Sequence, residues 1–206
     1  MYLSQLTLNL ESFNTRRLLL NPYSLHQAIC RAFPDATEGG TGRILYRFDE
    51  GNQTGVATLL VQSEKEPQWD RAELLSGCLG EPPRTKIYNP KPIRGQVLHF
   101  RLRANPTVKR NGTRLGLLRE EDQLRWLNRK AIASGFAVLS CMVVSEGIEK
   151  SMKPDATGGA LSFLAVRFDG LLRVDEPELF LKSLQGGIGS GKGIGFGLLS
   201  VAPARA

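Results

Sequence analysis

Histidine and cysteine are scarce in this sequence of 206 residues, which contains two histidines and three cysteines. The cysteines, Cys30, Cys78 and Cys141, are odd in number and far apart, so they form neither a disulfide framework nor a CxxC metal site. No HxH, HExxH or paired-aspartate motif occurs, and the carboxylates are spread along the chain. These absences argue against a two-metal hydrolytic site. They also predict a reducing, cytoplasmic compartment, with no metal and no cofactor.

Long apolar runs are absent as well. No stretch of 18 or more apolar residues occurs, so no transmembrane helix is expected. The beginning of the sequence, MYLSQLTLNLESF, lacks the basic region and the apolar block of a signal peptide. We therefore expect neither a membrane partner nor secretion.

The sequence does have a surplus of positive charge. Its 27 lysines and arginines exceed 20 acidic residues, for a formal net charge of +7. Such a surplus attracts polyanions, which are usually nucleic acid or an anionic membrane surface. A basic protein without such a partner is the alternative, since net charge reports on association and solubility only. The hydrophobic fraction of 41% is enough for a packed core.

The first half of the chain predicts the order β-α-β-β-α-β. A strand is expected over 2–9. A helix follows, with Asn21 as N-cap and Pro22 in the first helical position, and it ends at Pro34. Strands at 43–48 and 56–62 are joined by a turn at 51–55, and a weak helical stretch near 70–78 precedes a strand at 84–88.

The second half predicts the same order again. Residues 81–95 hold four of the eleven prolines and are the expected boundary. Next come a strand over 96–104 that stops at Asn105-Pro106, a helix at 120–134, strands at 136–144 and 161–168, a helix at 176–185 and a strand at 196–201. The predicted fold is α+β, with two tandem ferredoxin-like domains over residues 1–90 and 91–206.

His26 is the first candidate for chemistry. Tyr23, His26 and Cys30 fall within an arc of about 60° on one face of the first helix, apart from the apolar face. Tyr23 and His26 lie in the first turn, where free backbone N–H groups and the helix dipole favour a phosphate. An imidazole and a phenol in that position suit proton transfer at neutral pH. The alternative is a solvated histidine on a surface helix.

His99 is the second histidine, and it lies in the strand over 96–104. Alternation places Leu98, Phe100, Leu102 and Ala104 on a core face. His99, Arg101 and Arg103 then share the other face as a basic stripe that can follow an RNA backbone. A solvated row of charges is the alternative, and we expect His99 to contact RNA and not to act as a catalyst.

Glycines fill the segment QGGIGSGKGIGFGLLSVAP near the end of the chain. Backbone amides can approach phosphates closely there, with Lys192 adding charge, so Gly189, Gly191, Lys192 and Gly193 are candidate RNA contacts. Residues 186–192 fit GxxxxGK, but Gly193 stands where a P-loop needs Ser or Thr, which argues against a nucleotide-hydrolysing P-loop. The alternative is a flexible loop. We do not prefer it, because seven glycines carry a high cost in conformational entropy.

Four segments together resemble one known family: MYLSQLTLN, NPYSLHQAICRAFP, FRLRANPTVKR and GGIGSGKGIGFGLLSVAP, in this order. They are similar to the CasE family, also called Cse3, the endoribonucleases of type I-E CRISPR systems within the RAMP superfamily. The resemblance spans essentially the whole chain. It implies two ferredoxin-like domains, binding of the repeat hairpin of precursor CRISPR RNA, and cleavage at its 3′ base. It further implies retention of the mature crRNA and assembly with other Cascade subunits, with no direct DNA partner.

The resemblance also implies site residues. Tyr23 and His26 match the catalytic positions of the family, and a basic residue on a hairpin of the second domain is the third contributor. That hairpin is expected at 145–160, where Lys150 and Lys153 are the only basic residues; either can fill the role, and we assign it to Lys153. The complete set of RNA contacts that we expect is His99, Arg101, Arg103, Lys109, Arg110, Lys150, Gly189, Gly191, Lys192 and Gly193.

The expected mechanism needs no metal, because the RNA's own 2′-hydroxyl attacks the adjacent phosphorus. This yields a 2′,3′-cyclic phosphate and a 5′-hydroxyl. His26 serves as base to the 2′-hydroxyl or as acid to the leaving 5′-oxygen, Tyr23 positions the reacting groups, and a lysine offsets the developing charge. A non-catalytic RNA-binding RAMP subunit and a P-loop-like nucleotide binder are the other possible classes.

Overall fold

A computed structural model of the chain describes residues 1–33, 40–50, 54–151 and 161–204. Backbone contacts divide it into two compact units. Unit 1 comprises Met1–Asn89, Lys150–Leu161 and Lys192–Gly195, and unit 2 comprises Pro90–Glu149, Ser162–Gly191 and Phe196–Ala206. The main division therefore falls between Asn89 and Pro90, and two short later segments join unit 1. The continuous domain ranges 1–90 and 91–206 stay a prediction.

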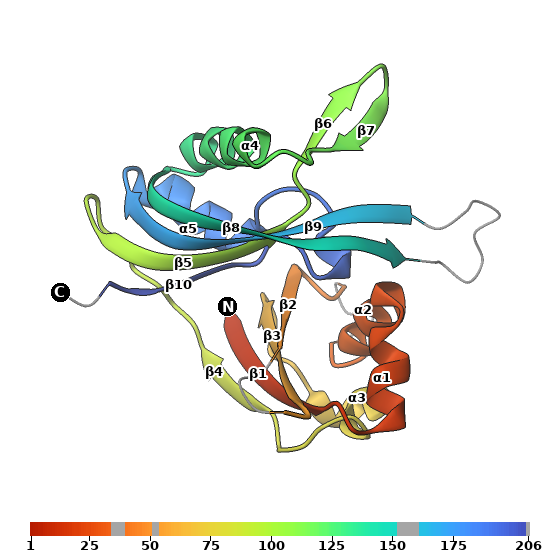
Figure 1. The fold of residues 1–206 in the computed structure, drawn as a ribbon. Coiled ribbons are helices and arrows are strands. Elements are labelled where there is room, and N and C mark those ends of the chain that lie inside the picture. Colours follow the sequence, from red (N-terminus) through yellow and green to blue (C-terminus); the bar gives the residue numbers. More distant parts are fainter. Residues whose placement is uncertain (34–39, 51–53, 152–160, 205–206) are drawn as a thin grey trace. The chain divides into compact units, whose positions relative to one another are not determined.

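Unit 1 contains a four-stranded antiparallel sheet in the order β2-β3-β1-β4 (Figure 1). This order is the one that a βαββαβ unit adopts when its first and third strands are central, as in the ferredoxin-like fold. The elements are β1 (Tyr2–Asn9), α1 (Phe13–Leu19), α2 (Pro22–Cys30), β2 (Ile44–Glu50), β3 (Val56–Ser63), a 3-10 turn (Trp69–Arg71), α3 (Glu73–Ser76) and β4 (Arg84–Ile87).

The core of unit 1 lies between this sheet and its helices. Alternation along β1 buries Leu6 and Leu8, and the apolar face of α2 buries Leu25, Ala28 and Ile29 in the same cluster. The register, from Tyr2 opposite Ser63 to Asn9 opposite Val56, holds β1 beside β3 along its whole length. A one-residue slip would expose every buried side chain of the strand, so the apolar pattern specifies this register.

Unit 2 repeats the topology, with the sheet order β10-β5-β9-β8. Helices α4 and α5 lie on one face of the sheet (Figure 1). They contribute Trp126, Leu127, Phe180 and Leu184 to the core of the unit. The elements are β5 (Val97–Ala104), β6 (Thr107–Arg110), β7 (Thr113–Gly116), α4 (Glu120–Ala133), β8 (Phe136–Ser151), β9 (Leu161–Val174), α5 (Pro177–Gly186), a 3-10 turn (Lys192–Ile194, within unit 1) and β10 (Leu199–Pro203).

A small hairpin, β6–β7, is inserted between β5 and α4 and was not among the predicted elements. Its turn is Asn111-Gly112, with positive φ angles of 48° and 81°. An Asn-Gly pair between short strands is among the strongest local signals for a two-residue hairpin turn, because both central residues need positive φ. The sequence therefore contains a signal for this hairpin, although no hairpin was predicted here.

The prediction of two ferredoxin-like units is confirmed, whereas some element lengths were wrong. Strands β8 and β9 run to Ser151 and from Leu161 to Val174, well beyond the expected 136–144 and 161–168. Helix α1 was not expected, and α2 ends at Cys30, before Pro34, which lies outside the described residues. Residues 51–53 of the expected turn at 51–55 also lie outside them.

Candidate active site

Helix α2 begins as its sequence predicts. The side chain of Asn21 accepts a hydrogen bond from the backbone N–H of Tyr23 at 3.2 Å, and Pro22 opens the helix. Asn21 is extended and satisfies one of the N–H groups that a helix start leaves without an intrahelical partner. This cap sets the start of the helix, and with it the direction in which Tyr23 and His26 project.

The imidazole of His26 is half-buried in unit 1. The Sγ atom of Cys30, one turn along α2, lies 3.6 Å from His26 Nε2 and 3.9 Å from Nδ1. The ring of Tyr46, from β2, stacks on the imidazole with ring centroids 6.1 Å apart and planes 17° apart. This offset, parallel arrangement lies within the favourable range for aromatic pairs.

Gly193 forms a third wall of this histidine pocket. A Cβ atom built on Gly193 would lie 3.5 Å from His26 Nε2, an ordinary van der Waals distance, so Gly193 lies beside the Nε2 edge of the ring with room between them for about a methyl group. The Tyr46 hydroxyl bonds the carbonyl oxygen of Gly193 at 3.2 Å and that of Pro22, also at 3.2 Å. Lys192, Gly193 and Ile194 form a 3-10 turn grouped with unit 1, so the glycine-rich segment reaches His26 itself.

Burial controls the protonation of this pocket. Desolvation lowers the pKa of His26 from its usual value of 6.5, because the charged imidazolium loses water more expensively than the neutral ring. The same effect raises the pKa of the Cys30 thiol. At neutral pH the pocket therefore holds a neutral imidazole beside a protonated thiol. A neutral imidazole can accept a proton from a substrate hydroxyl, which is the chemistry of a general base.

Tyr23 lies in the first turn of α2, three residues before His26. Its phenol oxygen accepts a hydrogen bond from the Gln27 side chain at 3.4 Å, one turn along the helix. Both expected residues thus belong to the same short helix, and the ring of His26 contacts Cys30 and Tyr46. The catalytic role of Tyr23 stays a prediction.

One of the two predicted hairpin lysines, Lys150, belongs to β8. Lys150 is exposed on this strand, and Lys153 lies outside the described residues. Lys192 is half-buried in the 3-10 turn next to Gly193.

The basic stripe expected on β5 is not a row of open cations. Arg103 is only 9% exposed and forms ion pairs with Glu146 and Glu149 of β8, both at 2.6 Å. Arg101 is half-buried and pairs with Asp169 of β9. His99 is exposed, as alternation predicted. The prediction of an open stripe was wrong for Arg101 and Arg103. Alternation identified their face of the sheet correctly, but the carboxylates on neighbouring strands cannot be located from the sequence of β5 alone.

Arg103 also supports the end of the glycine-rich segment within unit 2. Its guanidinium lies 4.7 Å from the centre of the Phe196 ring, a cation–π contact. Its backbone carbonyl accepts a hydrogen bond from Gly197 N–H at 2.8 Å. These contacts give Arg103 a structural role that was not predicted from the sequence.

Unit 2 has a basic cavity beside the β6–β7 hairpin, with a volume of about 290 Å³. Its cations are Lys109, Arg114, Arg129 and Lys130, and no carboxylate belongs to its described lining. Ser190 Oγ, also in the lining, is buried and has no hydrogen-bond partner among the described residues. Of the predicted RNA contacts, Lys109 and Gly189 line this cavity, whereas Arg110 is exposed at the end of β6. The prediction did not include Arg114, Arg129 or Lys130.

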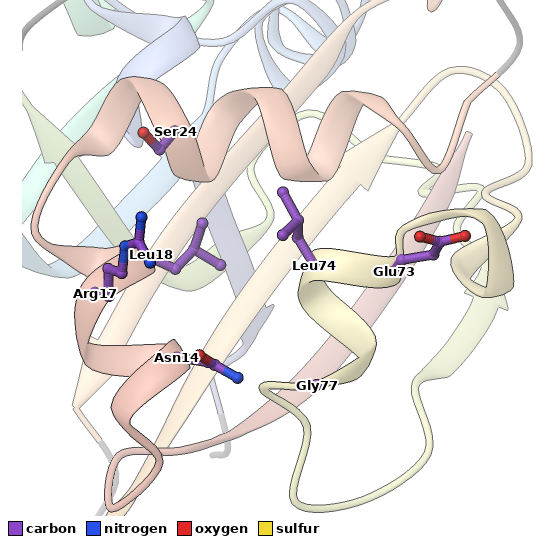
Figure 2. A pocket seen from close by; sticks show the side chains of 7 residues that line it. All are labelled: Asn14, Arg17, Leu18, Ser24, Glu73, Leu74 and Gly77. Carbon is purple, nitrogen blue, oxygen red and sulfur yellow. The ribbon is translucent and has the colours of Figure 1, made fainter.

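A second cavity, of about 390 Å³, lies in unit 1 between α1, α2 and α3 (Figure 2). Leu18 and Leu74 give it an apolar side, and Arg17 and Glu73 bring opposite charges to it. None of the predicted site residues lines it. The complete lining is Asn14, Arg17, Leu18, Ser24, Glu73, Leu74 and Gly77.

Within the described residues, no group of three or more His, Cys, Asp or Glu side chains is placed to hold a metal ion. In the same part of the chain, no helix is both long and apolar enough to span a membrane.

Comparison with known proteins gives consistent matches along the chain. The sequence model of the family described as CRISPR associated protein matches residues 1–203. The CRISPR-associated endoribonuclease Cse3 of Thermus thermophilus is 35% identical over 219 residues, covering 98% of this chain and 100% of that protein. The Cascade subunit CasE of Escherichia coli K12 is 29% identical over 194 residues, covering 88% of this chain and 92% of the relative.

The fold has solved counterparts as well. The structure of Thermus thermophilus Cse3 bound to an RNA representing a pre-cleavage complex superposes with a TM-score of 0.82 at 34% sequence identity. The match covers 98% of each chain, so it includes both units.

Proposed function

This chain belongs to the family of CRISPR-associated proteins, and on that premise we propose that it is an endoribonuclease that cuts CRISPR precursor RNA. Its substrate is the hairpin formed by the repeat, which it cleaves at the 3′ base of the stem. Relatives named as an endoribonuclease and as a Cascade subunit support both the activity and a place in a Cascade complex. The setting is the cytoplasm, where the enzyme keeps its mature crRNA.

The observation that carries the proposal is the histidine pocket at the start of α2. A half-buried imidazole whose pKa is lowered by burial is neutral at pH 7 and can accept a proton. It lies about one turn from the start of α2, and the positive dipole end of that helix favours an anion. His26 then removes the proton of the 2′-hydroxyl, the 2′-oxygen attacks the adjacent phosphorus, and the bond from phosphorus to the 5′-oxygen breaks while that oxygen takes up a proton from water. The products are a 2′,3′-cyclic phosphate and a 5′-hydroxyl.

The other catalytic roles follow the family pattern. Tyr23 orients the phosphate or the nucleophile from the same helix turn, and Lys153 offsets the charge that develops on the phosphoryl oxygens. All the groups in this scheme come from the protein and the RNA, so the reaction is proposed to proceed without a metal ion.

The hairpin β6–β7 and helix α4 supply the main RNA-binding surface of unit 2. Lys109 and Arg114 face each other directly across the hairpin, and like charges in that position destabilise a β-ladder. Arg129 and Lys130 add two more cations to the same cavity. A phosphate backbone removes this repulsion on binding, and A-form RNA offers mainly shape and backbone for recognition.

The deciding experiment incubates the purified chain with its own repeat RNA in excess EDTA. We expect a single cut and a 2′,3′-cyclic phosphate end. A second RNA, with 2′-deoxyribose only at the nucleotide before the cut, should bind nearly as well and stay whole, because it lacks the internal nucleophile.

Two outcomes would contradict the proposal. Cleavage that depends on added magnesium would replace internal attack by metal-assisted hydrolysis. Tight binding of the repeat RNA without any cut would assign the chain to the non-catalytic RNA-binding subunits of the same superfamily.

A further inference from the structure

Tyr46 occupies an unusual position for a tyrosine, because its ring is in the core and its hydroxyl is shared between two backbone segments. The residue is 1% exposed and belongs to the apolar cluster of unit 1. A buried hydroxyl costs free energy unless it finds hydrogen-bond partners. In this case the partners are Pro22 O, in the first turn of α2, and Gly193 O, in the glycine-rich segment.

These two partners lie far apart in the sequence but both adjoin His26. Pro22 begins the helix that carries His26, and Gly193 lies beside the Nε2 edge of the His26 ring, within reach of a single added methyl group. The phenol has a single O–H, so it is shared between the two carbonyl groups, each at 3.2 Å. The hydroxyl therefore holds the glycine turn, Lys192–Ile194, against the start of α2.

The ring of the same residue contacts the imidazole face. Stacking at a centroid distance of 6.1 Å limits the rotation of the His26 side chain, while Cys30 Sγ lies beside the ring nitrogens. Packing and hydrogen bonding thus act together at Tyr46. Phenylalanine would supply the packing alone, so core filling does not explain the hydroxyl.

We propose that Tyr46 is a positioning residue of the active site, which aligns His26 for proton transfer and closes the pocket with the glycine turn. This proposal rests on the proposed function, since alignment matters only if His26 moves a proton. In this role Tyr46 acts through His26 and Gly193, and it takes no direct part in the proton transfer. A misplacement of about 1 Å in such a group can cost about 10²-fold in rate.

The test compares Tyr46→Phe with Tyr46→Leu and with a matched control, Tyr2→Phe. Tyr46→Phe removes only the hydroxyl, Tyr46→Leu also removes the stacking ring, and Tyr2→Phe deletes a phenol hydroxyl from β1 of the same unit. Each protein is checked for folding by thermal denaturation. Single-turnover cleavage of the repeat RNA is then measured at saturating enzyme from pH 5 to pH 8, together with the RNA dissociation constant.

For Tyr46→Phe we expect a cleavage rate about tenfold lower, with RNA affinity changed by less than about twofold. Loosening the glycine turn admits water to His26, so the acid limb of the pH–rate profile should move upward, toward pH 6.5. Tyr46→Leu should lose more activity, whereas Tyr2→Phe should cleave like the wild type. A Tyr46→Phe protein with the wild-type rate and pH profile would overturn the proposal.

A second readout is independent of cleavage. The chain has two histidines, so His26 can be assigned by NMR from the spectrum of a His26→Ala protein. Tyr46→Phe should shift the His26 ring signals and raise their titration midpoint. If the wild type failed to cut RNA, the proposed function would fall, and an unchanged His26 titration in Tyr46→Phe would separately refute the positioning role.

Discussion

The two units share their order of elements and of strands, but they surround their ionisable side chains in opposite ways. In unit 1, His26 lies against a phenol ring, a thiol and a glycine backbone, all of them uncharged. In unit 2, Arg101 and Arg103 lie against the carboxylates of Asp169, Glu146 and Glu149 on neighbouring strands.

This difference shows how one topology serves two purposes. Uncharged, partly dry surroundings favour the neutral imidazole, which keeps a proton acceptor available near pH 7. Desolvation by itself would lower the pKa of Arg103. The hydrogen bonds and negative charges of Glu149 and Glu146 together outweigh this effect, so the pKa is raised above its usual value and the guanidinium stays charged. Arg103 thereby holds β5, β8 and the segment at Phe196 together, whereas no carboxylate belongs to the described lining of the basic cavity beside the β6–β7 hairpin.

Replacing His26 should give the largest effect of the changes that test this difference between the units. His26→Ala removes the proton-transfer group and leaves the apolar face of α2 intact, so we expect at least roughly a 10²-fold loss of single-turnover cleavage. The affinity for the RNA hairpin should change only slightly. The control is His99→Ala, the only other histidine, which is exposed on β5 and should affect binding more than turnover. A His26→Ala protein that folds and cuts normally would move the active site elsewhere.

Removing Arg103 tests whether the arginines of β5 are structural. Arg103→Ala would leave Glu146 and Glu149 without their main partner in a partly buried site, and we expect a loss of about 2 kcal/mol in the free energy of unfolding. Urea denaturation measures this. Arg101→Ala serves for comparison, since its side chain is 41% exposed and its ion pair should contribute less than about 1 kcal/mol. Equal effects of the two substitutions would contradict the structural role of Arg103.

The salt dependence of RNA binding tests whether the hairpin cations of unit 2 contact RNA more than the paired arginines of β5 do. Lys109→Ala combined with Arg114→Ala should reduce the slope of log affinity against log salt by about two units, because two phosphate contacts are lost. We expect a smaller change from Arg101→Ala, whose guanidinium already pairs with Asp169. Filter binding at several salt concentrations gives both slopes. An unaltered slope in the hairpin double variant would mean that this cavity does not face RNA.

The pH dependence of His26 is the smallest expected effect. Its titration midpoint, followed by NMR, should lie below 6.5 in the folded protein. Because the unfolded chain then binds the proton more tightly, the contribution of His26 to stability is full above about pH 6.5 and is lost as the pH falls through the lower, folded pKa. Cleavage should hold its plateau down to the same folded pKa and decline below it. A midpoint above 6.5 would refute the desolvated pocket.

Much of the fold could be predicted from local patterns. The cap Asn21, Pro22 and the apolar spacing of Leu25, Ala28 and Ile29 identify α2, because a helix start and a buried face are both local properties. Alternation along β5 identified the core side chains Leu98, Phe100 and Leu102 for the same reason. The Asn111-Gly112 turn was equally local, and the hairpin could have been predicted from it.

The candidate site was predictable only in part. His26 and Tyr23 were found from the scarcity of histidine, from helix position and from a family resemblance. Tyr46 was not found, because its sequence context, ILYRF, indicates only a strand, and its contact with His26 joins residues 20 positions apart on different elements. Gly193 was predicted as an RNA contact, and its place beside the imidazole was not foreseen.

The sequence by itself determined the elements, the two apolar cores, the basic charge and the identity of the one helix-end histidine. All of these depend on residues that are neighbours along the chain, or on totals over it. The tertiary structure alone decided which neighbours each ionisable group received. Among the described residues, Cys30 and Tyr46 contact His26, and Glu146 and Glu149 pair with Arg103, because strand order and register bring distant residues together, and a pKa depends on those contacts in space.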